Sequence, residues 1–461
     1  MKSLKQAHFP LDSTIREFAD RFDNTGHSLY VVGGAVRDWL LGIPNDDYDF
    51  TTDAKPEEVM AMFRKVIPTG IKHGTVTVLY KGARYEVTTF RIEDEYQDHR
   101  HPQSVRFVRN LEEDLKRRDF TINAIAADAL TGQIIDRHNG IGDLGRKVIR
   151  AIGDPRQRFA EDALRILRAC RFATKLDFEI DTATYEAMRE LAPTLRHVSG
   201  ERVRDELVKM LSCKHPLHGF ELLHASGILQ VLLPEVEAGD RVEQKGMHRY
   251  DVLTHGFYAC QAAADLDAPL EVRIAALLHD IGKPSVRHED ENGDFTFYKH
   301  EFVSEKQAKD ILDRLKFSNS ERDRILNLIR NHMFHYTSDW SDGAVRRFIA
   351  RVGEDALGNL FLLRLADQKA ICGRCDFSTL QELQDRIERI LKNRDALTVK
   401  DLAINGNDLL SLGIPADQRM GVILARLLEA VLDDPSQNTK EQLSIMAKHI
   451  ARVISELQGN N

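Results

Sequence analysis

Two aspartates separated by one residue, Asp47 and Asp49, are the first side chains in the sequence whose spacing indicates chemistry. On an extended strand, residues two apart point to the same face, so both carboxylates would lie side by side. Neighbouring carboxylates repel each other unless a cation lies between them, which is typical of a Mg²⁺ site. A pair of metal ions can activate an attacking hydroxyl and stabilise the leaving oxygen in phosphoryl transfer. A solvated acidic turn is the alternative interpretation of these two residues alone.

Further residues around the aspartates would complete a site for a nucleoside phosphate. Gly33 and Gly34 follow a predicted strand and begin a predicted helix, where backbone N–H groups can approach a phosphate closely. Arg37, one turn later, can reach the same phosphate. Glu86, on a later predicted strand, can supply a third carboxylate. A tight turn explains the glycines equally well, and Glu86 alone would be an ordinary exposed strand residue.

A basic segment in the middle of the chain indicates a polyanionic substrate. The whole chain has 461 residues and a net charge of −8, yet residues 146–175 contain nine basic and three acidic residues. Local charge rather than net charge determines where phosphate binds. Four polar residues in this segment recur every three positions, which on a helix forms one slowly winding stripe. A solvated basic face is the alternative. The stripe consists of Asp162, Arg165, Arg168 and Arg171.

The elements that must position these residues can be read from the hydrophobic periodicity. The pattern predicts an amphipathic helix over residues 12–24, a strand over 28–32, a helix through 37–41, a strand over 48–51 and a helix over 55–65. Residues 76–80 and 85–91 alternate like paired strands joined by a turn at 81–84. The first 150 residues are therefore predicted to be mixed α+β, and helical periodicity dominates the rest. A polar stretch, residues 236–247, is a candidate linker.

Three stretches of this chain closely resemble the class II tRNA nucleotidyltransferase and poly(A) polymerase family. The first is VVGGAVRD at residues 31–38, followed by LLG at 40–42 and DYD at 47–49. RRDFTINA at residues 117–124 resembles the family's ribose-recognition motif, and EDALR at residues 161–165 its nucleobase-selecting motif. Together they extend the resemblance over residues 25 to about 240. It implies a polymerase-β-like head, a small mixed sheet with helices, followed by a mostly helical neck, body and tail.

The resemblance assigns roles to the residues of these motifs. Arg118 is expected to contact the nucleotide, and Asp119 to face the sugar hydroxyls, which would favour ribonucleotides. Asp162 would accept a hydrogen bond from the amino group of cytosine or adenine, while Arg165 would donate to the adjacent ring acceptor. Guanine and uracil would mispair with both side chains, so this pair can select C and A without a template. Arg168 and Arg171 would hold the triphosphate or the RNA end.

Two other segments are similar to parts of the same family. Residues 91–102 resemble the flexible loop that the family needs to add the final A, which favours CCA addition over addition of CC only. The tail, with DLAINGNDLL at residues 401–410 and glycines at 413 and 421, is expected to meet the tRNA elbow. A surface excursion and simple helix packing are the respective alternatives.

A second group of side chains, in the helical half, resembles the HD phosphohydrolase superfamily. Its centre is LLHDIGK at residues 277–283, in which a histidine and an aspartate are adjacent. Imidazole and carboxylate ligands together suit a divalent transition metal or Mg²⁺. Single histidines are usually structural, but the complete set favours a metal site, and two of its histidines allow a second ion. This domain is expected either to hydrolyse phosphates at RNA ends or only to hold RNA. The set is His255, His279, Asp280, His300, His332 and Asp367.

Composition excludes several classes of protein. There is no run of about 18 apolar residues that would span a membrane, and the polar N-terminus lacks the apolar core of a signal peptide. Five scattered cysteines favour a reducing cytoplasm over a disulfide framework. Cys372 and Cys375 form one CxxC pair without a partner pair, which is more typical of incidental cysteines than of a zinc or redox site.

The sequence therefore predicts a cytoplasmic enzyme that adds CCA to the 3′ end of tRNA from CTP and ATP, with Mg²⁺ at one site and a divalent metal at the HD site. Its predicted domains are a head at residues 1–150, a neck and RNA-binding region at 151–240, an HD domain at 248–395 and a helical tail at 396–461. A poly(A) polymerase and an A-only tRNA nucleotidyltransferase are alternatives. A different class, an HD phosphohydrolase whose front half only binds RNA, is also open, as is the oligomeric state.

Overall fold

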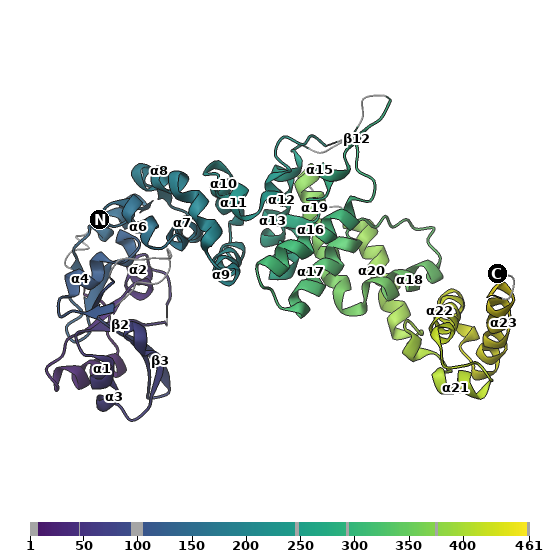
Figure 1. Cartoon of the computed structure of the whole chain (residues 1–461), viewed down its shortest axis with the longest axis horizontal. Helices are drawn as coiled ribbons and strands as arrows, with labels where there is room; N and C mark the ends of the chain where they lie inside the picture. The colour runs from purple at the N-terminus through teal and green to yellow at the C-terminus, as the bar shows by residue number, and fades with distance from the viewer. Residues whose placement is uncertain are drawn as a thin grey trace. The chain divides into compact units, whose positions relative to one another are not determined.

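The computed structural model describes residues 8–45, 47–93, 105–244, 249–291, 295–373 and 377–458. These residues form two compact units. Unit 1 comprises residues up to Glu237 together with Arg314–Lys316, and unit 2 comprises Ala238–Asp313 and the chain from Phe317 onwards. In Figure 1, unit 1 takes the purple to teal part of the colour bar and unit 2 the green to yellow part.

A seven-stranded mixed sheet forms the centre of the first half of unit 1, with strand order β3-β4-β5-β2-β1-β8-β9. Only β2 and β5 pair in parallel, and their register places Asp49 directly beside Glu86. The other neighbours are antiparallel. The strands of this sheet are β1 (Leu29–Val32), β2 (Asp49–Thr52), β3 (Val66–Gly70), β4 (Thr75–Tyr80), β5 (Ala83–Thr89), β8 (Ile125–Asp128) and β9 (Ile134–Asp136). Two further strand pairs are separate from it. They are β6 (Arg91–Glu93) with β7 (Val105–Phe107), and β10 (Val148–Ile149) with β11 (Glu179–Ile180).

An aromatic core holds the first helix against this sheet. Helix α1 (Ser13–Asp23) begins where the Asp12 side chain accepts a hydrogen bond from the N–H of Ile15, and it buries one apolar face. The ring of Phe18 lies 5.3 Å from that of Phe50 on β2 and 4.9 Å from that of Tyr85 on β5, centroid to centroid. This packing fixes the two strands that carry Asp49 and Glu86.

The predicted elements of the head occur in the structure with shifted ends: the strand predicted over 85–91 is β5, which begins at Ala83 and ends at Thr89, and one predicted helix also ends early. Helix α3 (Pro56–Met62) ends three residues earlier than the pattern predicts, and the chain continues into β3. The predicted helix end at residue 65 is therefore wrong, because Val66 and Ile67 pair with Val78 and Thr77 of β4 and complete the edge of the sheet. Tertiary pairing outweighs local helical propensity there.

Helices make up the rest of unit 1. Helix α7 (Leu164–Leu176) packs against α9 (Gly200–Leu211) and α10 (Pro216–Ala225). The candidate linker begins with helical residues, since Val236 belongs to α12. The remaining helices are α2 (Gly34–Leu40), α4 (Leu111–Lys116), α5 (Gly140–Arg146), α6 (Pro155–Glu161), α8 (Thr182–Leu191), α11 (Ile228–Leu232) and α12 (Pro234–Glu237), with 3-10 turns at Ile71–His73, Thr121–Asn123 and Ala192–His197.

Unit 2 is helical apart from one short hairpin of β12 (His288–Glu289) and β13 (Phe295–Thr296). Helices α13 (Val252–Asp265), α14 (Leu270–Leu278), α17 (Asn319–Asn331) and α19 (Glu354–Cys372) pack on one another. The other elements are α15 (Lys283–Val286), α16 (His300–Arg314), α18 (Asp342–Val352), α20 (Ser378–Lys392), α21 (Gly406–Ser411), α22 (Gln418–Asp433) and α23 (Lys440–Gln458), with 3-10 turns at Val399–Asp401 and Pro435–Gln437. The predicted fold class, a mixed-sheet head followed by a mostly helical remainder, is confirmed.

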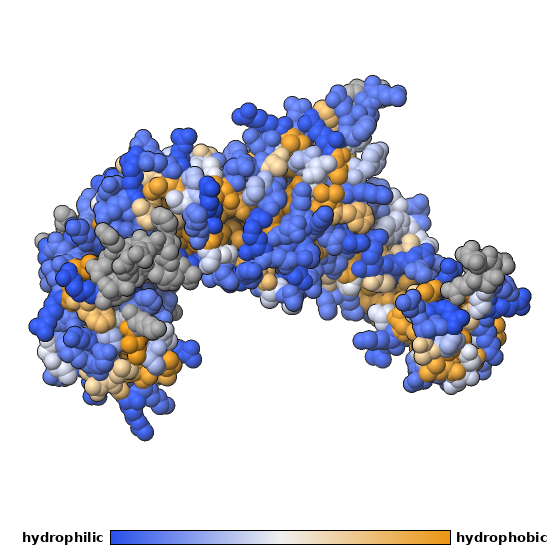
Figure 2. All heavy atoms as spheres, viewed as in Figure 1, coloured by the Kyte–Doolittle hydropathy of each residue, from blue (hydrophilic) through white to orange (hydrophobic). Residues whose placement is uncertain are grey.

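The exterior is mainly polar. On the face drawn in Figure 2, hydrophilic side chains cover most of the visible surface, and apolar ones show in smaller patches among them. Among the described residues, no helix is both long and apolar enough to cross a membrane.

Candidate functional site

A cavity of about 820 Å³ in unit 1 brings the first set of predicted residues together. Both aspartates lie in its wall with the glycine pair and with the polar stripe, although these segments are more than 100 positions apart in the sequence. The cavity wall is strongly basic. The predicted residues that line it are Gly33, Gly34, Arg37, Asp47, Asp49, Arg118, Asp119, Asp162, Arg165, Arg168 and Arg171.

Three carboxylates come together where β2 begins beside β5, in the middle of the sheet. Asp49 is the first residue of β2, whereas Asp47 precedes the strand, so the two do not share a strand face as the sequence suggested. Glu86 lies beside Asp49 in the parallel register. Loss of water around Asp49, then the charges of Asp47 and Glu86, raise the pKa of Asp49 to about 6, while Arg118 lowers it. This crowding of negative charge fits a cation site.

Gly33 lies between the side chains of Arg118 and Asp49, and its lack of a Cβ leaves space there. Its φ of 71° is a left-handed conformation that favours glycine. A Cβ there would lie 3.5 Å from Nη1 of Arg118 and 4.0 Å from Oδ2 of Asp49. Arg37 is buried, and its guanidinium donates to Asp38 and to Oδ1 of Asn123 (2.6 Å), so it holds the wall of the cavity together.

Asp119 is a buried carboxylate that organises one arginine of the stripe. Its Oδ2 accepts from Nε and Nη2 of Arg168 at 2.8 and 2.6 Å, and its Oδ1 accepts from Nδ2 of Asn123 at 3.0 Å. Burial raises the pKa of Asp119, but Arg168 and Asn123 outweigh it and hold that pKa at about 2. Asp119 is thus charged and fully engaged in the protein alone.

Asp162 and Arg165 are also held by neighbours. Asp162 lies between α6 and α7, where one oxygen accepts from the N–H of Leu164 and the other from Nη2 of Arg202 at 2.7 Å. Arg165 donates to Glu161 at 2.7 Å and to the carbonyl oxygens of Arg158 and Arg117. Asp162 is therefore not on the helix as predicted, but α6 and α7 still bring it beside Arg165.

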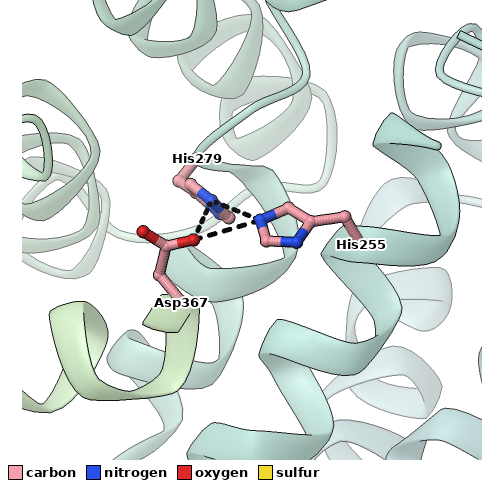
Figure 3. A group of neighbouring side chains, drawn as sticks. All are labelled: His255, His279 and Asp367. Atoms are coloured by element: carbon pink, nitrogen blue, oxygen red, sulfur yellow. Dashed lines mark hydrogen bonds and ion pairs between the residues drawn. The ribbon is translucent and has the colours of Figure 1, made fainter. Parts of the chain in front are cut away.

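The second set of predicted residues converges in the interior of unit 2. Nε2 of His255 lies 3.2 Å from Nε2 of His279 and 3.1 Å from Oδ1 of Asp367. Figure 3 shows these three side chains pointing toward one another from separate helices. Ligands of one ion at bond lengths of about 2.1 Å lie about 3.0–3.4 Å apart, so this spacing fits a bound metal.

A second ligand group is joined to the first through Asp280. Its Oδ2 lies 3.2 Å from Nε2 of His279, while its Oδ1 lies 3.1 Å from Nε2 of His300 and 3.7 Å from Nε2 of His332. Two overlapping groups of potential ligands result, and His279 belongs to both. One carboxylate thus faces two candidate ion positions.

Backbone carbonyls orient three of these rings. The Nδ1 atoms of His279, His300 and His332 lie 2.7–2.9 Å from the carbonyl oxygens of Ala276, Phe297 and Ile329. Such a bond places the proton on Nδ1 and turns the Nε2 lone pair inward, as in known metal sites.

Protonation of the cluster also fits a cation. In the protein alone, burial lowers the pKa of His279, but Asp280 and Asp367 raise it to about 10. The proton held by His279 shows that Asp280 and Asp367 require a positive charge beside them. A divalent ion would satisfy the same carboxylates.

Family models match both regions of the chain that contain these residues. The chain matches family models for the poly A polymerase head domain over residues 29–150, the probable RNA and SrmB-binding site of polymerase A over 177–239, and the HD domain over 250–396. It is 34% identical to a CCA-adding enzyme of Lactobacillus johnsonii, over 92% of this chain and 93% of the relative. The chain belongs to the CCA-adding enzyme family.

Other members of the CCA-adding enzyme family give the same result. The Lactobacillus helveticus enzyme is 53% identical, over 43% of this chain and 50% of that enzyme. The crystal structure of Bacillus stearothermophilus CCA-adding enzyme in complex with CTP has a TM-score of 0.69 and 30% identity, and the match covers 96% of this chain and 98% of that one. The predicted family, enzyme class and HD domain are confirmed.

Several residues at the cavity of this family member were missed by sequence reasoning. Asn123 joins Arg37 to Asp119, and Arg202 holds Asp162. Lys175 and Lys209 also line the cavity. Arg202 and Lys209 lie on α9 about two turns apart on one face, a signal that is indistinguishable in sequence from a solvated basic helix.

Two sequence interpretations lie partly outside the described residues. Most of the loop at residues 91–102 and the cysteine at 375 fall there, so neither the loop nor the CxxC pair is tested. In the tail, residues 401–410 form a turn and helix α21, which Asn405 and Asp408 cap reciprocally. The part of the tail expected to meet tRNA stays a prediction.

Proposed function

We propose that this chain adds CMP and AMP, from CTP and ATP, to the 3′ end of tRNA and releases pyrophosphate. The observation that carries the proposal is the single cavity in which Asp47 and Asp49 face the polar stripe around α7. Metal-binding acids and base-selecting side chains must share one site if protein rather than template chooses the base. The names of the relatives and the complex of the Bacillus stearothermophilus enzyme with CTP support the same substrates.

Different residues of this chain have different roles in the proposed reaction. Asp47 and Asp49, with Glu86 beside them, would hold Mg²⁺, which supplies activation of the attacking hydroxyl and charge neutralisation at the phosphates. Arg118, placed next to Gly33, faces the phosphate side of the cavity. Asp119 holds the guanidinium of Arg168 in place through two hydrogen bonds, and Arg171 adds a further positive charge.

Base selection is proposed to rest on Asp162 and Arg165. The carboxylate of Asp162 retains unused lone pairs beyond its bonds to Arg202 and Leu164 and can accept from the amino group of cytosine or adenine. Arg165 has five N–H groups, and its bonds to Glu161, Arg158 and Arg117 use three, which leaves donors for the ring acceptor. Uracil and guanine would leave these groups mispaired.

Single-triphosphate assays test the proposal. With a tRNA that ends at the discriminator base, CTP alone should add two nucleotides, and CTP with ATP should add three. Incorporation of ATP alone into long tails would favour a poly(A) polymerase, and addition of A only after CC has been supplied would favour an A-only enzyme. Asp47→Ala should lose addition, whereas Asp53→Ala, which lies just after the opposite end of β2 and outside the cavity wall, should retain it.

We propose a second activity for unit 2, a metal-dependent phosphohydrolase acting on phosphates of RNA ends. The joined ligand groups around Asp280 favour it over a purely structural role. In such a reaction water adds to phosphorus, the bond from phosphorus to a sugar oxygen breaks, and that oxygen takes a proton. Retained activity in His279→Ala would contradict the assignment, and full nucleotide addition by Asp47→Ala would instead favour a phosphohydrolase whose front half only binds RNA.

The domain limits also remain proposals: a head at residues 1–150, a neck at 151–240, an HD domain at 248–395 and a tail at 396–461. A cytoplasmic location is supported by the free thiols of Cys170, Cys213 and Cys260.

A further inference from the structure

A large aromatic side chain lies unusually exposed beside the metal-ligand cluster of unit 2. Tyr298 is 81% exposed, more than any other large hydrophobic residue among those that the structure describes. It lines the cavity of about 690 Å³ that also contains His279, Asp280 and Asp367. Exposure of a whole aromatic ring at the opening of a polar cavity suggests a ring that binds a ligand rather than the core.

The cavity has two chemically different parts. Its floor carries the histidine and aspartate ligands, and the cations Lys283, Lys299 and Arg364 lie in the same wall. Apart from Thr296 and Glu301, the rest of the wall is apolar or aromatic and consists of Phe295, Phe297, Tyr298, Met333 and Ile371. A ligand that matches this lining has a phosphate at one end and a flat apolar group at the other.

The backbone fixes Tyr298 relative to the cluster. It lies two residues before His300, whose N–H donates to the carbonyl oxygen of Phe297 at 3.3 Å. The same oxygen is 2.9 Å from Nδ1 of His300, and the N–H of Phe302 donates to Lys299 at 3.2 Å. The segment that carries the exposed ring is therefore tied to a metal-ligating side chain.

We propose that Tyr298 is a stacking platform for the nucleobase of a nucleotide whose phosphate lies at the cluster. The inference rests on the proposed phosphohydrolase activity and adds a subsite to it. Every base has a flat π-face, so stacking on tyrosine accepts all four bases. The subsite would raise affinity for nucleotides over other phosphate esters without selecting one base.

A matched pair of substrates tests the subsite. Adenosine 2′,3′-cyclic phosphate and glycerol 1,2-cyclic phosphate contain the same five-membered cyclic ester, but only the first has a base. Tyr298→Ala should raise KM for the adenosine ester about 10-fold with little change in kcat, as expected for loss of one stacked base. KM for the glycerol ester should not change, and Tyr298→Phe should restore the wild-type KM.

Phe302→Ala is the matched control. Phe302 is also exposed, at 45%, on the first turn of α16, but its ring contacts Arg330 rather than the cavity. This variant should leave KM for both esters unchanged. An unchanged kcat on the glycerol ester shows that unit 2 folds in both variants, and nucleotide addition to tRNA should also be normal.

Fluorescence gives a readout that does not depend on catalysis. In Tyr298→Trp without added metal, adenosine 2′-monophosphate should quench the new tryptophan, whereas ribose 5-phosphate should not. Titration of the wild-type protein corrects for its two native tryptophans and for nucleotide bound in unit 1.

The outcomes separate the two proposals. Equal effects of Tyr298→Ala on both esters, or no effect on either, would overturn the stacking subsite while leaving hydrolysis intact. If the metal-loaded wild-type protein cleaves neither ester, the phosphohydrolase proposal fails, and the fluorescence titration still decides whether Tyr298 stacks on a base. Absence of quenching would overturn the subsite in that case as well.

Discussion

Asp49 carries an electrostatic cost that binding of a cation would remove. Its pKa of about 6 lies above the ordinary value of 3.8, so the folded protein binds a proton there more tightly than the unfolded chain does. Ionisation of Asp49 therefore lowers stability as pH rises from 3.8 through 6, and the loss is complete above that window.

Asp49→Asn should be more stable than wild type in metal-free buffer at pH 8, because the neutral amide removes the repulsion. At pH 3.5 the difference in stability should nearly disappear, since Asp49 is then protonated in the folded protein and mostly protonated in the unfolded chain. Thermal unfolding of both proteins in EDTA across this pH range measures the difference. Adding Mg²⁺ at pH 8 should raise Tm of the wild type only, and a difference that persists at pH 3.5 would contradict the explanation.

Arg202 should affect which base is added. Arg202→Ala removes the partner of one Asp162 oxygen, so the carboxylate is free to turn away from the base. We expect kcat/KM for CTP to fall about 10-fold to 100-fold, a loss of about 1.4–2.7 kcal/mol of transition-state stabilisation, with a smaller loss for misincorporated UTP.

Kinetics with each triphosphate measure this ratio. Arg189→Ala, an exposed arginine on α8 outside the cavity, is the control. An equal loss for CTP and UTP would indicate a general structural effect rather than positioning of Asp162.

Residues in continuous motifs were predictable from the sequence, whereas their partners were not. Asp47, Asp49 and the stripe from Asp162 could be predicted because each motif has its own characteristic pattern. These residues do line one cavity. Arg202 acts on Asp162 from 40 positions away, and nothing in its own helix distinguishes it from a solvated residue. The assignment of Asp162 to a helix was wrong because α7 begins two residues later.

Among the elements, α7 and α9 are joined by an ion pair that involves Arg171, one residue of the stripe. The guanidinium of Arg171 forms an ion pair with Glu206, and both side chains are largely buried. Arg171 also lies 3.9 Å above the ring of Phe172. The position of α9 thus determines where two residues of the cavity wall lie, Asp162 and Arg171.

Glu206→Ala should destabilise unit 1 by about 3–5 kcal/mol, because Arg171 would be left as a buried charge without its main partner. The double variant Arg171→Met/Glu206→Leu should recover most of that loss. Urea unfolding followed by a probe placed in unit 1 measures both. If the double variant is no more stable than Glu206→Ala, the buried charge is not the cause.

Element boundaries show where local patterns stop being sufficient. The sequence identified α1 and the β4–β5 pair, because amphipathic periodicity and alternation are local. It missed β3, whose residues are mostly exposed and include Pro68, so that they lack the usual strand pattern. Only pairing with β4 makes that segment a strand.

At the scale of the whole molecule, the two cavities belong to separate compact units. The family assignment could be predicted from the motifs, but the two-unit division could not, because contacts between distant helices determine it. We expect that a substitution in one unit can abolish its activity while the activity of the other unit is retained.

Metal binding to unit 2 should therefore be separable from nucleotide addition. At a Mn²⁺ concentration 100-fold above Kd, the ion should stabilise the wild-type unit by about 2.7 kcal/mol. His279→Ala should show little of this stabilisation and should still add nucleotides to tRNA. Calorimetric unfolding with and without Mn²⁺ provides the measurement, and loss of nucleotide addition in this variant would show that the units depend on each other.

The single carboxylate of Asp280, whose two oxygens face different histidines, implies cooperativity. An ion held on one side would fix the orientation of that carboxylate, which prepares the opposite side for its own ion. Occupancy should then rise steeply with metal concentration, with a Hill coefficient above one. Asp280→Asn should abolish this steepness, because an amide cannot bridge two cations as a carboxylate does.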